Sequence, residues 1–246
     1  MNAWMRYPSK SRSALIVLIM VILTIWILVQ TGAIKARFRV KRTGISEKVV
    51  SLPEPSLKGN MSVEEAIYRR RSIRDYRQEP LSIKELSQLL WAAQGITFQK
   101  YGFRSAPSAG ATYPLELYIS VKEGGVSGLQ AGIYHYSPFD HTIELVKKGD
   151  FSEELTRAAL DQPWVGKAAI CIIIAANFER TTSVYGERGV RYVYLEAGHV
   201  GQNIYLQATA LNLGTVAIGA FHDDWVQSIV GCSEHPIYLF PVGRRW

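Results

Sequence analysis

A run of basic side chains, Arg69-Arg70-Arg71-Ser72-Ile73-Arg74, is the segment of this 246-residue sequence whose residue types and spacing most clearly suggest chemistry. Guanidinium groups that converge with a hydroxyl on one anion suit a phosphate monoester. A solvated basic face at the end of a helix is the ordinary alternative, because cations are favourable near a helix C-terminus. Taken alone, the run favours this alternative.

Two other segments could bring backbone close to a flat heterocycle. Residues 107–114, Pro-Ser-Ala-Gly-Ala-Thr-Tyr-Pro, are mostly small and allow a close approach. Residues 218–221, Ile-Gly-Ala-Phe, could present backbone N–H groups at the end of a strand. An ordinary turn-rich connection and a strand with a bulge at Gly219 are the alternatives. With the further guanidinium of Arg244, these segments have the chemistry that a planar, phosphorylated cofactor needs.

Other common sites are not indicated. The sequence has no Gly-x-Gly-x-x-Gly, Walker, His-Glu-x-x-His or Gly-x-Ser-x-Gly motif. Its two cysteines are Cys171, in the apolar run AAICIIIAA, and Cys232. Cys171 is predicted to be an inert thiol in a buried strand, and no pair of histidines lies near either cysteine. We therefore expect neither a metal site nor a disulfide framework.

Two capping boxes predict where helices begin. Ser62 and Glu65 predict a helix that carries the arginines in its last turns, and Ser82 and Glu85 predict a second helix over 84–94. Strands are predicted at 115–121, 132–136, 142–146, 168–176, 215–221 and 237–242, and helices at 152–160 and 188–213. The irregular alternation predicts an α+β fold with a central mixed sheet flanked by helices.

The helix predicted over 188–213 has one apolar stripe at spacings of three and four residues. Gly198 and Gly201 would let a neighbouring backbone approach it closely, as in a central or intersubunit helix. His199 lies between them, and a histidine in such a place is more often structural than catalytic. Glu196 is interpreted as a solvent-facing or intersubunit charge.

The charge is concentrated near the N-terminus. The formal net charge is +7, and the first 42 residues hold eight cations and no acidic residue. Because these cations flank an apolar segment, they indicate a membrane-flanking region and not a nucleic-acid interface. No nucleic-acid partner is expected.

Residues 13–34 carry no charge and are long enough to cross a bilayer of about 30 Å as a helix. A cleaved signal peptide is the alternative, but the apolar run is long and no clear cleavage site follows. The sequence therefore predicts a membrane protein with a single-pass anchor over 1–42, a linker over 43–60 and a globular domain over 61–246. More cations follow the apolar run than precede it, which slightly favours the cytoplasmic side for the domain.

The motifs together resemble the nitroreductase superfamily, and within it the SagB-type branch related to thiazole- and oxazole-forming dehydrogenases. The resemblance rests on the basic run at 69–74, on residues 106–118, on Arg191-Tyr192 with Glu196-Ala-Gly-His-Val-Gly-Gln-Asn203, and on residues 214–221. It begins near Met61 and runs to the C-terminus. It implies an FMN-dependent oxidoreductase with an α+β sandwich fold. Such proteins are usually intertwined homodimers with the flavin at the subunit interface.

The resemblance also implies roles for single residues. The ligands of the FMN phosphate and ribityl chain would be Arg70, Arg71, Ser72 and Arg74, with Arg244 as a further phosphate ligand. The loop that packs on the isoalloxazine from the partner subunit would be Pro107, Ser108, Ala109 and Gly110. Ile218 and Gly219 would offer backbone N–H groups near flavin N5. The flavin itself would carry the hydride chemistry.

One departure from the family pattern bears on the substrate. Azole-forming members carry a Lys-Tyr pair where this sequence has Val184-Tyr185. Tyr185 is a candidate acid, but without the lysine the oxidation of peptide azolines is disfavoured. We therefore expect electron transfer from a donor such as NAD(P)H to a small acceptor such as a quinone or a nitroaromatic compound. An azoline-to-azole dehydrogenase and a non-catalytic flavin-binding or scaffold protein are the alternatives.

Overall fold

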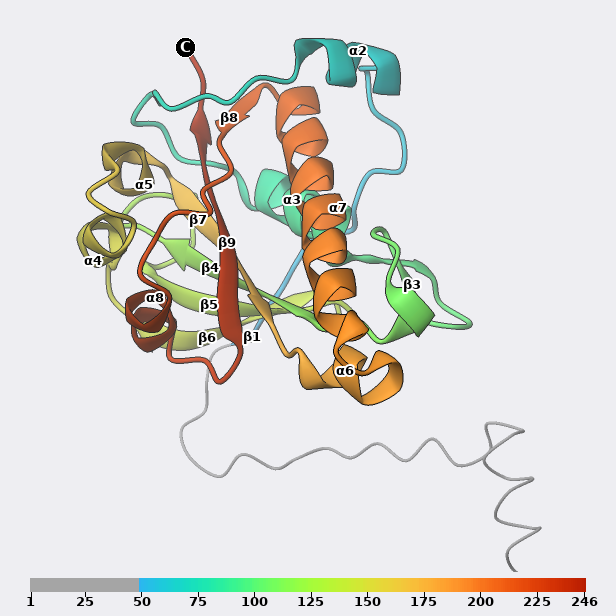
Figure 1. Cartoon of the computed structure of the whole chain (residues 1–246). Coiled ribbons are helices and arrows are strands. Elements are labelled where there is room, and N and C mark those ends of the chain that lie inside the picture. The colour runs from blue at the N-terminus through green and yellow to red at the C-terminus, as the bar shows by residue number, and fades with distance from the viewer. Residues whose placement is uncertain (1–48) are drawn as a thin grey trace, which may run out of the picture. The chain divides into compact units, whose positions relative to one another are not determined.

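The computed structural model describes residues 49–246, which fold around a seven-stranded sheet (Figure 1). The strands of this sheet are β1 (Val49–Ser51), β4 (Leu115–Val121), β5 (Gly132–Ser137), β6 (Thr142–Lys148), β7 (Ile170–Ala176), β8 (Leu213–Thr215) and β9 (His235–Arg244). They lie in the order β1-β6-β5-β4-β7-β9-β8. A separate hairpin contains β2 (Ile96–Phe98) and β3 (Phe103–Arg104).

The α+β prediction is confirmed, but the predicted mixed sheet is wrong. Every pair of neighbouring strands in the large sheet is antiparallel. The physical reason is the connectivity. β4, β5 and β6 follow one another as antiparallel neighbours. β7 then pairs antiparallel with β4, and β9 pairs antiparallel with β7. The alternation of side chains along a strand is the same in both kinds of sheet, so it does not show strand direction.

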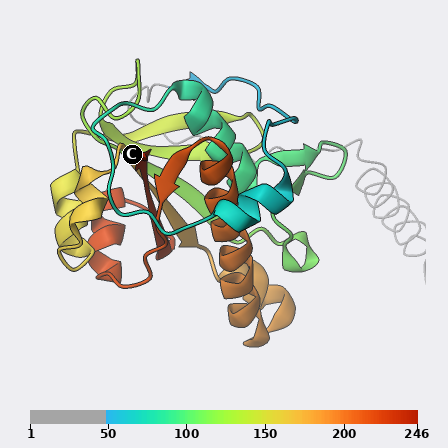
Figure 2. The same ribbon diagram turned by 90° about the horizontal axis from the view of Figure 1, so that it is seen from above.

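Helices cover both faces of this sheet, as the view from above shows (Figure 2). They are α2 (Val63–Arg69), α3 (Ile83–Gln94), α4 (Ser152–Ala158), α5 (Pro163–Lys167), α6 (Glu179–Tyr185), α7 (Arg188–Ala210) and α8 (Asp223–Val230). Alternate residues of β7 belong to two separate cores: Ile172 packs with the helices α3 and α7, and Ile173 packs with α4, α5 and α8. Cys171 is buried on the second face, which confirms its place in a core strand.

Both predicted helix starts are confirmed. Ser82 and Glu85 form the complete capping box of α3. At α2, the Ser62 hydroxyl accepts the N–H of Glu65, while the Glu65 carboxylate pairs with Arg69 at 2.6 Å. α2 ends at Arg69, so the rest of the basic run continues beyond the helix as extended backbone.

The helix α7 packs closely against the sheet at Gly201, one of the two glycines that predicted a close approach. A Cβ on Gly201 would lie 2.7 Å from the Phe240 ring of β9, so a larger residue would push the helix off the sheet. Gly198 is different, because a Cβ there would meet no described atom within 4 Å. α7 ends at Ala210, three residues before the predicted end at residue 213. Leu213, which was predicted to be helical, is instead the first residue of β8.

Residues 49–56, within the segment predicted to be a linker, are packed on the domain. β1 pairs with β6 from Val49 to Ser51. His141 Nε2 lies 3.1 Å from the Pro53 carbonyl and 2.7 Å from the Ser87 hydroxyl. The folded domain therefore includes part of the segment before residue 61.

The predicted membrane location has to be corrected. Among residues 49–246, no helix is long and apolar enough to cross a membrane. The apolar segment 13–34, with the rest of the predicted anchor over 1–42, lies outside the described residues. The predicted preference for the cytoplasmic side of a membrane has no support for the same reason.

Candidate functional site

The basic run passes the C-terminal end of α7, where Tyr205 contacts two of its members. The Arg70 guanidinium lies 5.0 Å from the centre of the Tyr205 ring, and the Ser72 hydroxyl lies 2.9 Å from the Tyr205 hydroxyl. The Tyr205 hydroxyl also accepts the N–H of Ala217 at 2.8 Å. One tyrosine therefore joins the basic run to the segment that precedes Ile218 and Gly219. Sequence reasoning missed Tyr205, although this residue directly follows Ile204, which belongs to the apolar stripe of the helix.

Close packing fixes the middle of the basic run on the sheet. The Ile73 N–H donates to the Thr215 carbonyl at 2.9 Å. A Cβ on Gly214 would lie 2.7 Å from Ile73, and a Cβ on Gly243 would lie 2.9 Å from Tyr76. Both glycines are therefore required for the chain to lie against β8 and β9. The arginines on either side of Ile73 project from a fixed backbone.

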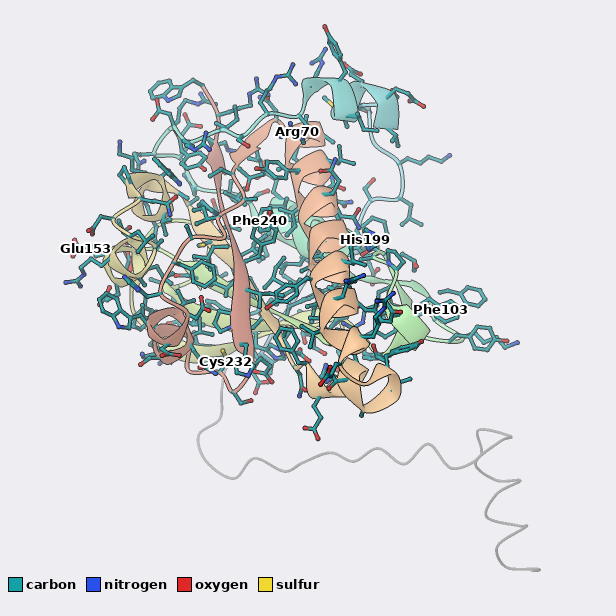
Figure 3. All side chains as sticks on the ribbon, in the orientation of Figure 1. Arg70, Phe103, Glu153, His199, Cys232 and Phe240 are labelled. Carbon is teal, nitrogen blue, oxygen red and sulfur yellow. The ribbon has the colours of Figure 1, made fainter. Side chains whose placement is uncertain are left out.

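These arginines differ in what their side chains contact. Arg74 lies 5.4 Å from the Trp164 ring centre and is exposed. Arg71 donates to the carbonyls of Tyr68 and Arg70, at the end of α2. Within residues 49–246, Arg70, Arg71 and Arg74 form no ion pair with a carboxylate. Their charges are therefore available to an anion (Figure 3 labels Arg70).

Arg244, the other predicted phosphate ligand, is already paired. Its two terminal nitrogens contact the two carboxylate oxygens of Glu85 at 2.6 and 2.8 Å. Burial would raise the pKa of Glu85, but hydrogen bonds from Arg244 and Ser82 outweigh burial and hold this pKa below its ordinary value. Arg244 thus ties the end of β9 to the start of α3, and an anion would have to compete with Glu85 for it.

The predicted ring-contacting loop is a strained turn. Gly110, Ala111 and Tyr113 have φ values of 58°, 53° and 44°. For the two residues with side chains, such φ values cost about 1–3 kcal/mol each, so the surroundings must hold the turn. The Ser108 hydroxyl contributes by accepting the N–H of Tyr113 at 2.9 Å.

Tyr185, the candidate catalytic residue, lies against this turn. A Cβ on Gly110 would be 2.6 Å from the Tyr185 hydroxyl, so only glycine leaves room for it. Tyr185 also packs edge-on against Tyr192 of α7, with ring centres 5.2 Å apart. The structure therefore brings together two segments that the sequence analysis treats separately. Val184, which stands where azole-forming enzymes have lysine, is 61% exposed.

The strand predicted over 215–221 is wrong, because β8 ends at Thr215 and Ile218 forms only an isolated bridge with Leu239. The Ile218 N–H donates to the Leu239 carbonyl at 2.9 Å, and Ile218 is buried, so this N–H is not available to a ring. Gly219 is exposed, and a Cβ there would meet no described atom within 4 Å. Open space beside Gly219 is compatible with a flat ligand there.

The predicted residues thus form two groups at opposite ends of α7. Arg70, Ser72 and Gly219 lie near Tyr205, close to the C-terminal end of the helix, whereas Gly110 and Tyr185 lie near Tyr192, close to its start. At 1.5 Å per residue, Tyr192 and Tyr205 are roughly 20 Å apart along the helix. One chain alone does not bring both groups to one ring.

Behind the strained turn lies a charged residue that the sequence analysis interpreted wrongly. Glu196 is only 3% exposed, so it is not a solvent-facing charge within the domain. Burial raises the pKa of its carboxyl, while Ser108, Gln94 and Arg104 lower this pKa to a smaller extent. Its position on the buried side of α7, three residues after Val193, is the sequence signal that could have shown this burial.

The architecture and the site define an α+β protein with a cationic segment and a strained turn at opposite ends of one long helix. Residues 67–244 match the nitroreductase family, and the chain belongs to this family. Membership of this family places the chain among the oxidoreductases.

Individual relatives agree with this assignment. A nitroreductase-family protein of Methanocaldococcus jannaschii is 49% identical over 185 residues, which cover 75% of this chain and 92% of that protein. A nitroreductase-family crystal structure from Ralstonia eutropha superposes with a TM-score of 0.72 and 30% identity, and covers 82% of this chain and 92% of its own. The microcin B17-processing protein of Escherichia coli is 27% identical over 161 residues, or 64% of this chain and 59% of its own length. The SagB-like resemblance is thereby supported.

Proposed function

We propose that this protein is an FMN-dependent oxidoreductase that transfers electrons from NAD(P)H to a small organic acceptor. The observation that carries the proposal is the basic run on Tyr205, whose arginines Arg70, Arg71 and Arg74 form no ion pair within residues 49–246. The same tyrosine contacts Ala217, two residues before the open position at Gly219. A relative from Bacillus subtilis, 25% identical over 184 residues, is an NAD(P)H-dependent FMN reductase. This relative supports both the cofactor and the electron donor.

The phosphate would be held by Arg70, Ser72 and Arg74, with Arg71 at the edge of the site. Guanidinium and hydroxyl donors match the oxygens of a phosphate monoester, and the fixed backbone at Ile73 orients them before binding. Arg70 is partly buried against Tyr205, which strengthens its charge interaction relative to a fully solvated pair. Arg244 would take part only after release from Glu85.

The isoalloxazine would lie at Gly219 of one subunit and against residues 107–110 of the other. FMN supplies the hydride transfer when bound, and the protein supplies position and electrostatics. The Gly219 N–H would hydrogen-bond the ring near N5. The Tyr185 hydroxyl, which lies beside Gly110, would donate a proton to a reacting molecule on that side.

The proposed acceptor is a quinone or a nitroaromatic compound. Such a substrate accepts hydride and takes its proton from water or from Tyr185, so no general base is needed. Azoline oxidation is the second candidate, and the similarity to the microcin B17-processing protein favours it. This reaction needs a base within hydrogen-bonding reach of the ring proton, and the exposed Val184 provides none.

Spectroscopy of the purified protein tests the proposed function. We expect a flavin absorption spectrum, and we expect denaturation to release FMN. Anaerobic NADH or NADPH should bleach the spectrum, and a quinone or nitroaromatic compound should restore it faster than an azoline peptide does. A protein that takes up no FMN, or one that releases FAD, would contradict the proposal. Turnover of the azoline peptide alone would favour the second candidate.

The site also implies a homodimer through α6 and α7. Tyr194 and Leu195 are each 55% exposed on the outer side of α7, and Val190 is 39% exposed. Such an exposed apolar surface favours a second copy of the chain as the partner. The separation of the two groups of predicted site residues, roughly 20 Å along one helix, favours the same partner, because a second chain could bring the two groups to one ring.

Leu195→Glu is expected to shift the protein from dimer to monomer, because a charge would be buried at the contact. Light scattering coupled to size exclusion measures this shift. Leu160→Glu, at a site 50% exposed just after α4 on the opposite face of the sheet, is the matched control and should leave the mass unchanged. A wild-type monomer that binds FMN normally would show that one chain completes the site.

A further inference from the structure

The helix α6 contacts the strained turn through a buried hydroxyl that the proposed function does not use. Thr181 of α6 is 1% exposed, and its hydroxyl lies 2.8 Å from the hydroxyl of Thr112 in the turn. The Thr112 hydroxyl donates its own proton to the Ala109 carbonyl at 3.0 Å. A threonine hydroxyl has only one proton, so Thr112 accepts the proton of Thr181. A chain of two hydrogen bonds therefore runs from α6 to Ala109, one of the residues assigned to the flavin.

Arg180, the preceding residue of α6, connects the same turn to the sheet. Its Nη1 donates to the Tyr113 carbonyl at 3.0 Å and contacts the Glu116 carboxylate of β4 at 2.6 Å. Glu116 also lies 2.8 Å from Nε2 of His135, on the neighbouring strand β5. The start of α6 is thus fixed to the sheet and to the end of the turn by one side chain.

Tyr185 lies on the face of α6 that contacts the turn. It follows Thr181 by four residues, so the two side chains share one face of the helix. A Cβ on Gly110 would lie 2.6 Å from the Tyr185 hydroxyl. Ala111, at the centre of the turn, has a φ of 53°, and such a conformation persists only where the surroundings hold it. The face of α6 that carries Thr181 and Tyr185 is in contact with the turn at this place.

We propose that Thr181 is a positioning residue for the flavin site. Its hydroxyl holds Ala109 through Thr112 and thereby keeps the turn and Tyr185 in one fixed arrangement. The ring-contacting side of the turn and the proposed proton donor then move together as one unit. Thr181 itself touches neither a ring nor a substrate. This proposal rests on the proposed function, because the turn is the segment assigned to the flavin.

Hydrogen exchange of the apoprotein tests whether Thr181 holds the turn. Thr181→Val keeps nearly the same shape and removes the hydroxyl. We expect the Tyr113 amide, which donates to the Ser108 hydroxyl, to open about three- to tenfold more readily, as the loss of one hydrogen bond implies. Thr181→Ser retains the hydroxyl and should restore protection to within about twofold of the wild type. Unchanged protection of the Tyr113 amide in Thr181→Val would overturn the proposal.

The same substitution at Thr182, the next residue of α6, is the matched control. Within residues 49–246 the Thr182 hydroxyl forms no hydrogen bond to the turn, and both variants exchange one β-branched residue for another. Thr182→Val should therefore leave the exchange of the Tyr113 amide as it is in the wild type. An equal opening in Thr181→Val and Thr182→Val would assign the effect to the helix as a whole and refute the role of the Thr181 hydroxyl.

Thr112→Val removes the other end of the hydrogen bond. In that background Thr181→Val should open the turn no further, because the shared contact is already absent. Additive effects of the two substitutions would count against the proposal. If Thr181→Val does not fold, Thr112→Val in the half-buried turn decides the question, since it must open the Tyr113 amide by itself.

Titration with FMN shows whether the held turn serves the cofactor. A loosened turn has to be ordered when a ligand binds, and this ordering weakens binding. We expect Thr181→Val to raise the FMN dissociation constant about three- to tenfold and Thr181→Ser to restore it. A turn that opens in Thr181→Val while the constant stays unchanged would overturn the positioning role. If the wild type binds no FMN, the proposed function fails, while the exchange experiment still decides whether Thr181 holds the turn.

Discussion

Arg70→Ala is expected to weaken FMN binding by about ten- to a hundredfold. A charge-assisted hydrogen bond to phosphate contributes about 1.5–3 kcal/mol, and Arg70 is the partly buried arginine that is held in place by Tyr205. Titration of the apoprotein with FMN, followed by quenching of flavin fluorescence, measures the change. The unfolding midpoint should stay close to that of the wild type, because Arg70 makes no ion pair within residues 49–246.

Arg71→Ala is the matched control. It removes the same charge from the neighbouring position, but its guanidinium donates to the carbonyls of Tyr68 and Arg70 at the end of α2. We expect its effect on the FMN dissociation constant to be several-fold smaller. Equal losses in the two variants would indicate a diffuse electrostatic attraction. An unchanged constant for Arg70→Ala would move the phosphate site elsewhere.

Glu85→Gln is expected to lower the free energy of unfolding by about 1.5–3 kcal/mol, the usual contribution of hydrogen bonds between charged groups. The Glu85 carboxylate holds Arg244 with two contacts and also caps α3. Because its pKa is below the ordinary value of 4.5, the wild type should lose this stabilisation as the pH falls below about 4.5. Urea unfolding at neutral and acidic pH measures both effects, and the variant should lack this part of the acid sensitivity.

The same variant separates the two possible roles of Arg244. If Arg244 is structural, Glu85→Gln and Arg244→Gln both destabilise the fold, and the FMN dissociation constant of the folded protein stays within about twofold of the wild type. If Arg244 is a phosphate ligand that Glu85 restrains, Glu85→Gln tightens FMN binding and Arg244→Gln weakens it as strongly as Arg70→Ala does. The bidentate contact favours the structural role.

Local signals predicted much of the fold. The capping box at Ser82 and the alternating pattern over 115–121 place α3 and β4 correctly, because caps and side-chain periodicity are properties of neighbouring residues. The helices α6 and α8 were missed. Each has eight residues or fewer and no capping side chain at its start, which is the signal that placed α2 and α3. The end of α8 is marked by Gly231 in the left-handed conformation, a stop signal that was not used.

Contacts between distant residues could not be predicted in the same way. Arg244 and Glu85 lie 159 residues apart, and nothing near Arg244 in sequence indicates that a carboxylate will occupy it. The contact of Ser72 with Tyr205 spans 133 residues. For Glu196 the periodicity was available, but charged residues are rarely buried, and the residue was interpreted as a solvent-facing or intersubunit charge. Residue types alone indicated the basic run and residues 107–114 as candidates, and the family resemblance assigned them their roles.

The two outer strands of the sheet have a consequence for how the protein behaves in concentrated solution. β1 and β8 are each three residues long, so neither offers a long row of free backbone groups to a neighbouring molecule. β1 also covers one side of β6, a strand of seven residues. A chain cut after Ser51 would uncover that side and leave an open template for strand addition between molecules. The short strand β1, before α2, therefore protects the domain against aggregation.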